Sequence, residues 1–147
     1  MSETREQVLR LGPDDAGRTL EHDEFERAEW APGYRYELVA GRLAVSPAPN
    51  FQHAVVQEWF HGHLMEYARQ HPKVFQAAIA VSRLITRSLG AVTDVQPDLA
   101  LYRVFPRSRT LAGWRDISPF VVLEVISDSD PEKDTERNPE IYWLVPS

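Results

Sequence analysis

The sequence predicts an α/β (α+β) fold, and two observations lead to that class. From Asn50 onward the expected order is helix, strand, strand, strand, a short polar segment and a last strand, which is typical of layered helix-and-sheet domains. The 147 residues are 43% hydrophobic and 26% charged, a composition that suits one globular domain with one core. We therefore expect a polar N-terminal lead-in over residues 1–18 and a single domain over residues 19–147.

A short helix and a β-hairpin are expected at the start of this domain. Thr19 can cap a helix that continues to Ala28 and ends before Pro32-Gly33. Residues 34–45 then alternate between apolar and polar side chains around a turn at Ala40-Gly41. In this alternation Glu37 points away from the face that carries the aromatic side chains.

The clearest helix follows Asn50, which is a preferred N-cap residue. Apolar side chains recur there with the helical period, and the helix is expected to end at His71-Pro72; they are Val56, Phe60, Leu64 and Tyr67. Residues 74–85 alternate as a strand would, and Leu89-Gly90 reads as a turn.

Three further segments complete the predicted order. Residues 96–102 and 120–126 are apolar runs that read as strands, separated by a long loop over residues 103–119. The segment 141–145 is expected to be a last strand.

Composition limits the possible functions without selecting one. The formal net charge is −6 and the isoelectric point is about 5.3, which disfavours general attraction to nucleic acid, although a local basic surface remains compatible with it. The chain contains no cysteine, so it has neither a disulfide framework nor a thiolate metal site. No apolar run approaches the roughly 20 residues of a membrane span, and the start lacks the apolar core of a signal peptide. We expect a cytoplasmic location.

Each of two predicted strands carries one carboxylate, Asp98 in the first and Glu124 in the second. A carboxylate in a buried strand is costly unless a cation or a proton accompanies it. Magnesium prefers oxygen ligands and needs only one or two protein carboxylates, so an ion between the two side chains is one solution. The other is that Asp98 caps a turn after Pro97 and that Glu124 pairs with an arginine at a sheet edge. The spacing alone leaves both open.

Several segments, in order, resemble the signature motifs of the bacterial putative restriction endonuclease family within the PD-(D/E)XK superfamily. They are residues 36–43 (YELVAGRL), residues 45–49 (VSPAP), His53, residues 96–99 (QPDL), residues 122–127 (VLEVIS) and residues 142–145 (YWLV). The resemblance covers residues 19–146. It implies a restriction-endonuclease-like mixed sheet with flanking helices, dependence on Mg²⁺ or Mn²⁺, and cleavage of phosphodiester bonds in DNA.

The resemblance assigns roles to individual residues. Asp98 and Glu124 match two metal-binding acids of the family, and Glu37 matches a third acid that would bind the ion directly or through water. For Glu37 the alternative is a hairpin glutamate that faces solvent. His53 matches a family position at the start of the long helix, where it would either help to position a phosphate or pack locally.

The chain departs from the family pattern at the catalytic lysine. The superfamily places this lysine two residues after the second acid, where this chain has Ile126. The resembled family places it on the next helix, and an ungapped alignment puts Asn138 there, a side chain that supplies no positive charge. Lys133 is the nearby substitute, which completes a candidate catalytic set with the three acids. The alternative is that Lys133 is an ordinary solvated side chain.

The second core helix is expected to be shortened or missing. Asn138 stands only a few residues before the predicted strand at residues 141–145, and the chain ends where its relatives continue, so we expect the domain to be truncated at the C-terminus. A sheet face left open by a lost helix would favour a homodimer.

Arginines in the long loop form a candidate nucleic-acid contact. Arg103, Arg107 and Arg109 lie there with Phe105 and Trp114 between or near them, a mixture that can hold a phosphate backbone beside a metal site. The alternative is a solvated loop that balances the acidic remainder.

Three functions are compatible with these patterns. The first is a magnesium-dependent nuclease in which the three acids hold the ion. The second is a catalytically inactive module that keeps the fold and binds nucleic acid or protein. The third is an incomplete product of a longer gene that folds poorly alone.

Overall fold

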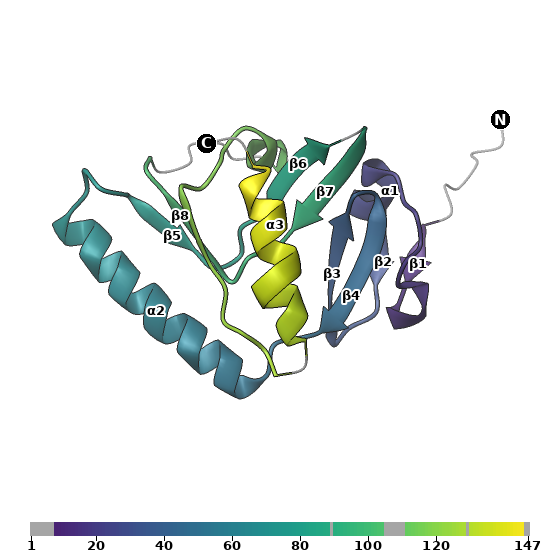
Figure 1. The fold of residues 1–147 in the computed structure, drawn as a ribbon, viewed down its shortest axis with the longest axis horizontal. Helices are drawn as coiled ribbons and strands as arrows, with labels where there is room; N and C mark the ends of the chain where they lie inside the picture. Colours follow the sequence, from purple (N-terminus) through teal and green to yellow (C-terminus); the bar gives the residue numbers. More distant parts are fainter. Residues whose placement is uncertain (1–7, 89, 105–110, 129, 146–147) are drawn as a thin grey trace, which may run out of the picture.

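The protein is described by a computed structural model over residues 8–88, 90–104, 111–128 and 130–145. Its larger sheets are antiparallel, and one short parallel pair lies near the N-terminus. The first sheet has the order β4 (Arg42–Pro47), β3 (Tyr34–Val39), β7 (Ala91–Val95), β6 (Leu84–Ser88), and the second has the order β5 (Ala77–Ile79), β8 (Leu99–Tyr102), β9 (Val121–Leu123). The parallel pair is β1 (Arg10–Leu11) with β2 (Glu29–Trp30). The α+β class is confirmed, with the described strands divided between two larger sheets and the parallel pair (Figure 1).

The predicted hairpin is confirmed as β3 and β4, which pair from Tyr34 opposite Pro47 to Val39 opposite Arg42. Ala40 and Gly41 form the turn with φ angles of 48° and 76°. Positive φ at both central residues is the geometry whose twist matches that of the flanking strands. The turn therefore sets the register that decides which side chains of β3 face each side of the sheet.

The first helix, α1 (His22–Arg27), begins later than predicted. Its cap is Glu21, whose backbone N–H donates to the Glu24 carboxylate at 2.9 Å, so the prediction of Thr19 as the cap is wrong. Thr19 instead forms a β-bridge with Arg42. An acid three residues into the helix satisfies a free backbone donor, and this decides where the helix begins.

Part of the expected lead-in packs against the rest of the chain. Residues 8–18 contain β1 and the short 3-10 helix η1 (Pro13–Asp15). Leu11 is buried among Leu20, Phe25 and Tyr36. The described part of this segment is therefore held by the apolar cluster beneath the hairpin.

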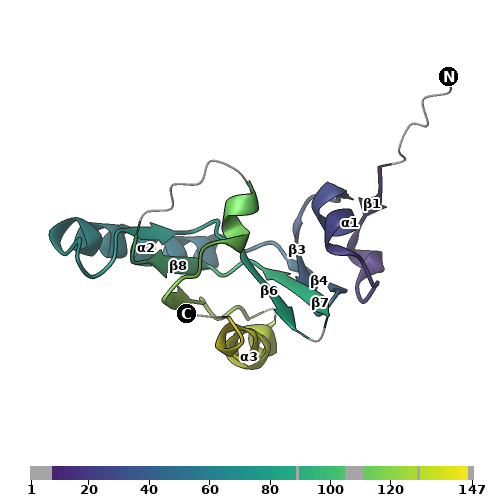
Figure 2. The same cartoon turned by 90° about the horizontal axis from the view of Figure 1, so that it is seen from above.

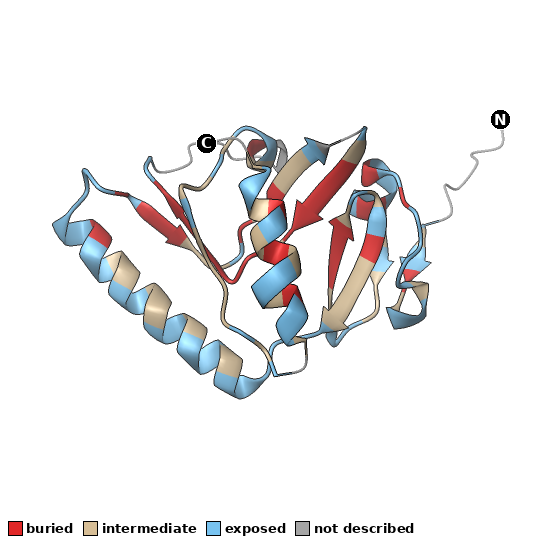
Figure 3. Ribbon diagram, viewed as in Figure 1, coloured by how far each residue is buried: buried red, intermediate tan, exposed pale blue. Residues whose placement is uncertain are grey.

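The long helix is confirmed as α2 (Phe51–Gln70), with the Asn50 side chain accepting a hydrogen bond from the His53 backbone at 2.9 Å. Its packing face is narrower than the apolar pattern suggests. Leu64, Met65 and Ala68 pack on the second sheet, whereas Val56 and Tyr67 are exposed. Figure 3 shows the helix mostly in the intermediate and exposed colours.

The single strand predicted over residues 74–85 is two strands in different sheets. β5 ends at Ile79 and β6 begins at Leu84, and Val81 between them is 81% exposed. The period-2 pattern continues through this turn, so alternation alone does not reveal the break. The following strand, β7, has no counterpart among the predicted elements.

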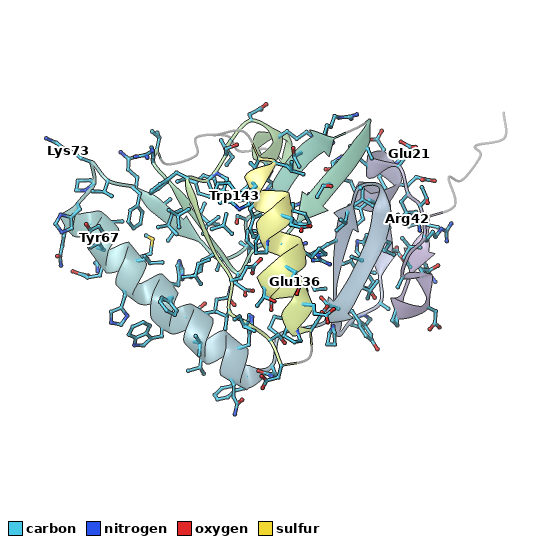
Figure 4. The ribbon with its side chains drawn as sticks, viewed as in Figure 1. Glu21, Arg42, Tyr67, Lys73, Glu136 and Trp143 are labelled. Atoms are coloured by element: carbon cyan, nitrogen blue, oxygen red, sulfur yellow. The ribbon has the colours of Figure 1, made fainter. Side chains whose placement is uncertain are left out.

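The strand predicted at residues 141–145 is wrong, because residues 131–143 are helical. The helix contains the wider turns of η3 (Lys133–Arg137) and continues as α3 (Asn138–Trp143). Asn138 and Ile141 are buried while Trp143 is 87% exposed, which is the periodicity of a helix. Figure 4 marks Glu136 and Trp143 on this helix.

The helix that was expected to be shortened or missing is thus present. Viewed from above, α3 lies on one side of the strands (Figure 2). Ile141 packs with Leu84 and Val95 of the first sheet, and Val122 of the second sheet packs against the same cluster. The open face that motivated the predicted homodimer is therefore covered by the chain itself.

Candidate active site

Asp98 and Glu124 lie side by side where β8 begins and β9 ends, since Leu99 pairs with Leu123. The Asp98 backbone N–H donates to Glu124 Oε2 at 3.1 Å, and the Val125 backbone N–H donates to Asp98 Oδ2 at 2.8 Å. Each carboxylate is thus anchored to the other strand. The predicted meeting of the two acids on neighbouring strands is present in the structure.

Asp98 is buried and also binds an arginine and a histidine side chain. Arg35 Nη2 donates to Asp98 Oδ1 at 3.1 Å, and His53 Nε2 lies 2.9 Å from Asp98 Oδ2. The alternative that pairs an acid with an arginine therefore holds for Asp98, although the sequence pattern suggested it for Glu124. His53 is brought to the site by the first turn of α2, as its place in the family motif implies.

Glu124 is bound by α3. Asn138 Nδ2 donates to Glu124 Oε1 at 2.8 Å, and the Tyr142 hydroxyl donates to the same oxygen. The pKa of Glu124 is raised to about 7, mainly by burial. The hydrogen bond from Tyr142 lowers this pKa, and the negative charge of Asp98 raises it. Burial and the neighbouring Glu124 charge raise the pKa of Tyr142. The site therefore holds two acids close enough for one to disfavour ionisation of the other.

Glu37 points into the molecule with 1% of its surface exposed, so the interpretation of a solvent-facing hairpin glutamate is wrong. The Gln96 backbone N–H donates to Glu37 Oε1 at 2.9 Å, and Arg137 Nη2 donates to Glu37 Oε2 at 2.7 Å. Lys133 Nζ lies 3.3 Å from the same Oε2. Glu37 is thus held by two cations from the C-terminal helix.

Lys133 is buried as well, so it is not the solvated lysine of the alternative interpretation. Its Nζ donates to Ser46 Oγ at 3.4 Å in addition to its contact with Glu37. The structure therefore brings the candidate substitute lysine to the acids, one helical turn before the position at which the family carries it.

Asn138 occupies that family position and is fully buried. Its Oδ1 accepts hydrogen bonds from Arg137 Nε at 3.1 Å and Nη2 at 2.9 Å, while its Nδ2 donates to Glu124. The amide therefore links Arg137 to Glu124. An unbroken polar chain runs from Glu37 through these residues to the acid of the second sheet.

Two site residues, Arg35 and Arg137, were missed by the sequence analysis. Arg35 stands two residues before Glu37, so the strand period places both on one face of β3. That spacing is a signal that could have identified Arg35. For Arg137 the sequence signal is weaker, because the direction in which its side chain points depends on a helix that the sequence analysis did not predict.

The donor set of the site fits magnesium through two of the predicted ligands. Asp98 and Glu124 supply hard oxygen ligands from two strands, and Mg²⁺ usually keeps several waters beside one or two carboxylates. Glu37 is drawn to Arg137 and Lys133. Within the described residues, a group of three possible metal ligands whose ligand atoms all lie within 4.8 Å of one another occurs away from this site, on α1; its members are His22, Asp23 and Glu26. The site therefore offers an ion the carboxylate pair of Asp98 and Glu124, and at Asp98 the ion would compete with Arg35.

The predicted arginine contact is only partly visible. Arg103 lies at the end of β8 opposite to Asp98 and stacks over the Phe120 ring, with its Cζ 4.5 Å from the ring centroid. Arg107 and Arg109, with Phe105, lie outside the described residues. Arg103 is therefore about 16 Å along the chain from Asp98 at about 3.3 Å per residue, which does not place it beside the two acids.

Arg115 is the last residue of the 3-10 helix η2 (Leu111–Arg115), and its side chain contacts α1 rather than the candidate active site. Its Nη2 lies 2.8 Å from His22 Nδ1 and 3.2 Å from Glu26 Oε2. This end of the arginine loop is therefore tied to α1 by ion pairing.

The structure is thus an α+β fold with paired acids where two of its strands meet. The model of the Uma2 family, described as "Putative restriction endonuclease", matches residues 22–145. The chain belongs to this family, which confirms the resemblance. None of the curated proteins with which the chain was compared matches it. In the part of the chain that the structure describes, every helix is too short or too polar to cross a bilayer.

Proposed function

We propose that this chain is a magnesium-dependent nuclease that hydrolyses phosphodiester bonds of DNA. Membership of a family described as restriction endonucleases supports the nuclease class. The observation that carries the proposal is the pairing of Asp98 and Glu124, each anchored by a backbone N–H of the opposite strand. Such anchoring holds carboxylate groups from two strands near each other, and Mg²⁺ commonly binds one or two protein carboxylates.

In this proposal Asp98 and Glu124 hold the ion, and Glu37 supports it through water. When bound, Mg²⁺ would polarise a phosphoryl oxygen and lower the pKa of a coordinated water. Lys133 holds Glu37 in place and presents a positive charge beside the acids. Because the phosphate of the substrate is an anion, an ammonium group at this position would stabilise the charge that develops on it.

A small cavity beside these residues supports the binding of a phosphate. Two acids, Asp130 and Asp134, line part of it, and its other polar walls include Arg35, His53, Lys133 and the side chain of Ser46. These are positively charged or hydrogen-bonding groups of the kind that bind phosphate oxygens. Each of the three nitrogen-bearing side chains also contacts one of the candidate acids, so a bound phosphate would lie next to the carboxylate pair.

The test is DNA cleavage with and without added Mg²⁺ or Mn²⁺, comparing the wild type with Asp98→Asn. The isosteric amide keeps the shape of a buried side chain whose complete removal would leave Arg35 and His53 unpaired. We expect metal-dependent cleavage that falls at least about a hundredfold in the variant, as for loss of a catalytic group. Asp128→Asn is the matched control, because Asp128 is an exposed acid of the neighbouring loop. Cleavage by Asp98→Asn at the wild-type rate would refute the assignment.

A second candidate function, a binding module without catalysis, is favoured by the charge balance of the site. Four basic side chains contact the acids, namely Arg35, His53, Lys133 and Arg137. The two arginines and Lys133 supply positive charge of the kind that an ion would bring, and the resemblance aligns Asn138, a neutral amide, with the family lysine. This candidate predicts DNA binding without turnover at any metal concentration, so cleavage above a metal-free control would eliminate it.

The homodimer and the cytoplasmic location stay predictions. Support for a second copy now comes from α2, where Phe51, Val55 and Trp59 recur at i, i+4 and i+8 and are all exposed. A row of this kind is long enough to pack against the same row of a second chain. Sedimentation of the full chain measures the oligomeric state directly.

A further inference from the structure

An open groove of about 510 Å³ lies at the end of the first sheet, next to the candidate active site. Its walls come from the start of β3, from the segment after β4, from Gln96 after β7 and from Arg83 before β6. Binding sites for small ligands commonly have volumes of about 300 to 1,000 Å³, so the groove is large enough for a nucleobase with its sugar.

Aromatic side chains line one wall of this groove. Trp30 and Tyr36 lie with ring centroids 4.5 Å apart, and Tyr34 and Tyr36 lie 6.3 Å apart. Tyr36 is buried and its hydroxyl donates to the Ala31 carbonyl at 3.0 Å, which fixes the ring. Tyr34 is 43% exposed and so offers a free ring face at the mouth. The wall is a fixed aromatic surface with one accessible ring.

The charged side chains of the groove differ in whether they face other charged side chains of the groove or the active site. Glu26 is bound by Arg83 at 3.6 Å and by Arg115 at 3.2 Å, and Arg83 also makes two hydrogen bonds to Asp94, so these charges are compensated within the protein. Arg35 is the basic side chain that reaches toward the active site. Its Nη1 donates to the Gln96 carbonyl at 3.4 Å while its Nη2 donates to Asp98.

The groove adjoins the cavity beside Lys133, because Arg35 and Pro49 line both. One end of this combined surface is aromatic, and the other carries the phosphate-binding groups proposed above. A guanidinium stands at the junction. Flat aromatic faces bind nucleobases by stacking, and basic side chains bind the phosphates between them.

We propose that this groove binds an unpaired nucleobase, so that the substrate is single-stranded DNA, or a nucleotide turned out of a duplex, with its phosphate beside Asp98. This inference rests on the proposed nuclease function and specifies its substrate class. The base stacks on Tyr34 and the neighbouring rings, and Arg35 contacts the adjacent phosphate. A base paired within a duplex does not expose its faces, so a stacked duplex cannot occupy the groove without opening.

The charge of the whole chain agrees with a local binding surface. With a formal net charge of −6, the protein has no general attraction for the DNA backbone. Binding therefore depends on stacking and on a few phosphate contacts, and single-stranded DNA provides both.

The experiment measures binding in EDTA, where metal-dependent cleavage is absent, by fluorescence anisotropy of a labelled mixed-sequence oligonucleotide. We expect the full chain to bind the single strand at least about tenfold more tightly than the corresponding duplex. Tyr34→Ala is expected to weaken single-strand binding by about fivefold or more, the loss of one base stacked on an aromatic ring. Arg35 is left unchanged, because it also holds Asp98.

Tyr67→Ala is the matched control. Tyr67 is 45% exposed, close to the value for Tyr34, but it lies on α2, across the molecule from Arg42 of the hairpin (Figure 4). This variant is expected to bind the single strand as the wild type does. Equal loss in both tyrosine variants, or equal affinity for single strand and duplex, would overturn the proposal.

The two proposals fail in different ways. Single-strand binding that depends on Tyr34, without cleavage at any metal concentration, would remove the nuclease function and keep the groove. If metal-dependent cleavage depends on Asp98 but the affinity for single-stranded DNA is unchanged in Tyr34→Ala, the nuclease function would stand and the proposed role of the groove would be refuted. A labelled single-stranded RNA of the same sequence shows in the same assay whether the groove prefers DNA, and tighter binding of RNA would also contradict the proposed substrate.

Discussion

The positive charge that the family places at one lysine is divided in this chain between Lys133 and Arg137. Both contact Glu37 Oε2, from positions four residues apart on one helix. Asn138 then hydrogen-bonds to Glu124, for which a neutral amide donates without repelling a bound cation. This arrangement places two cations at Glu37, while Asp98 keeps its own ion pair with Arg35.

Glu124 should make the stability of the metal-free protein depend on pH. Its pKa is raised from 4.5 to about 7 in the folded state, so the folded chain binds this proton more tightly than the unfolded chain does. The unfolding free energy contributed by this group therefore falls as the pH rises from about 4.5 to 7. Compared with Glu124→Gln, the wild type should lose on the order of 2 kcal/mol between pH 5 and pH 8.

Urea unfolding in EDTA at these two pH values measures the difference. The control is Glu136→Gln on the exposed side of the same helix, which should follow the wild type at both values. A difference between wild type and Glu124→Gln that does not change with pH would show that the Glu124 carboxyl is not shifted in this way.

The sequence analysis correctly predicted the elements that are determined by residues close together in the chain. The hairpin depends on alternation and on a turn of two residues, and α2 depends on Asn50 and a helical period, so both were found. The break between β5 and β6 was missed because alternation continues across it. Residues 141–145 were assigned to a strand because a short run of apolar residues is compatible with either a strand or a helix. The choice there is made by contacts with distant strands.

The hairpin turn offers a prediction at the same scale. Ala40 has φ of 48°, which costs an ordinary L-residue about 1 kcal/mol or more. Ala40→Asn places the preferred Asn-Gly pair in the turn and should raise the unfolding free energy by about 1 kcal/mol. Thermal unfolding should show a rise of about 2 to 4 °C.

Ala44→Asn, inside β4, is the comparison for this change. Asparagine is disfavoured within strands, so this variant should unfold at a lower temperature than the wild type. A fall in stability for Ala40→Asn as well would show that the turn conformation is not the source of strain.

The two sheets are joined at the scale of the whole molecule by α3. The cluster of Ile141 with Leu84 and Val95 also receives Val122 from the other sheet. The acids of the site are divided in the same way: Glu37 lies in the first sheet, while Asp98 directly precedes β8 and Glu124 directly follows β9 of the second sheet. Sequence analysis predicted each acid from its motif, but it could not predict this arrangement, since the helix that brings the cations to the site was assigned to the wrong class.

This arrangement predicts that the chain unfolds as one unit and that Ile141 holds the unit together. Ile141→Ala removes a buried side chain that touches both sheets, and such a change typically costs about 2 to 5 kcal/mol. Leu144→Ala is the control, because Leu144 is 60% exposed and its loss should change stability by less than about 0.5 kcal/mol. Urea unfolding followed by tryptophan fluorescence and by far-ultraviolet circular dichroism should give coincident single transitions. Two separated transitions, or equal effects of the two variants, would mean that the sheets are stable independently and that the chain behaves as the incomplete product considered above.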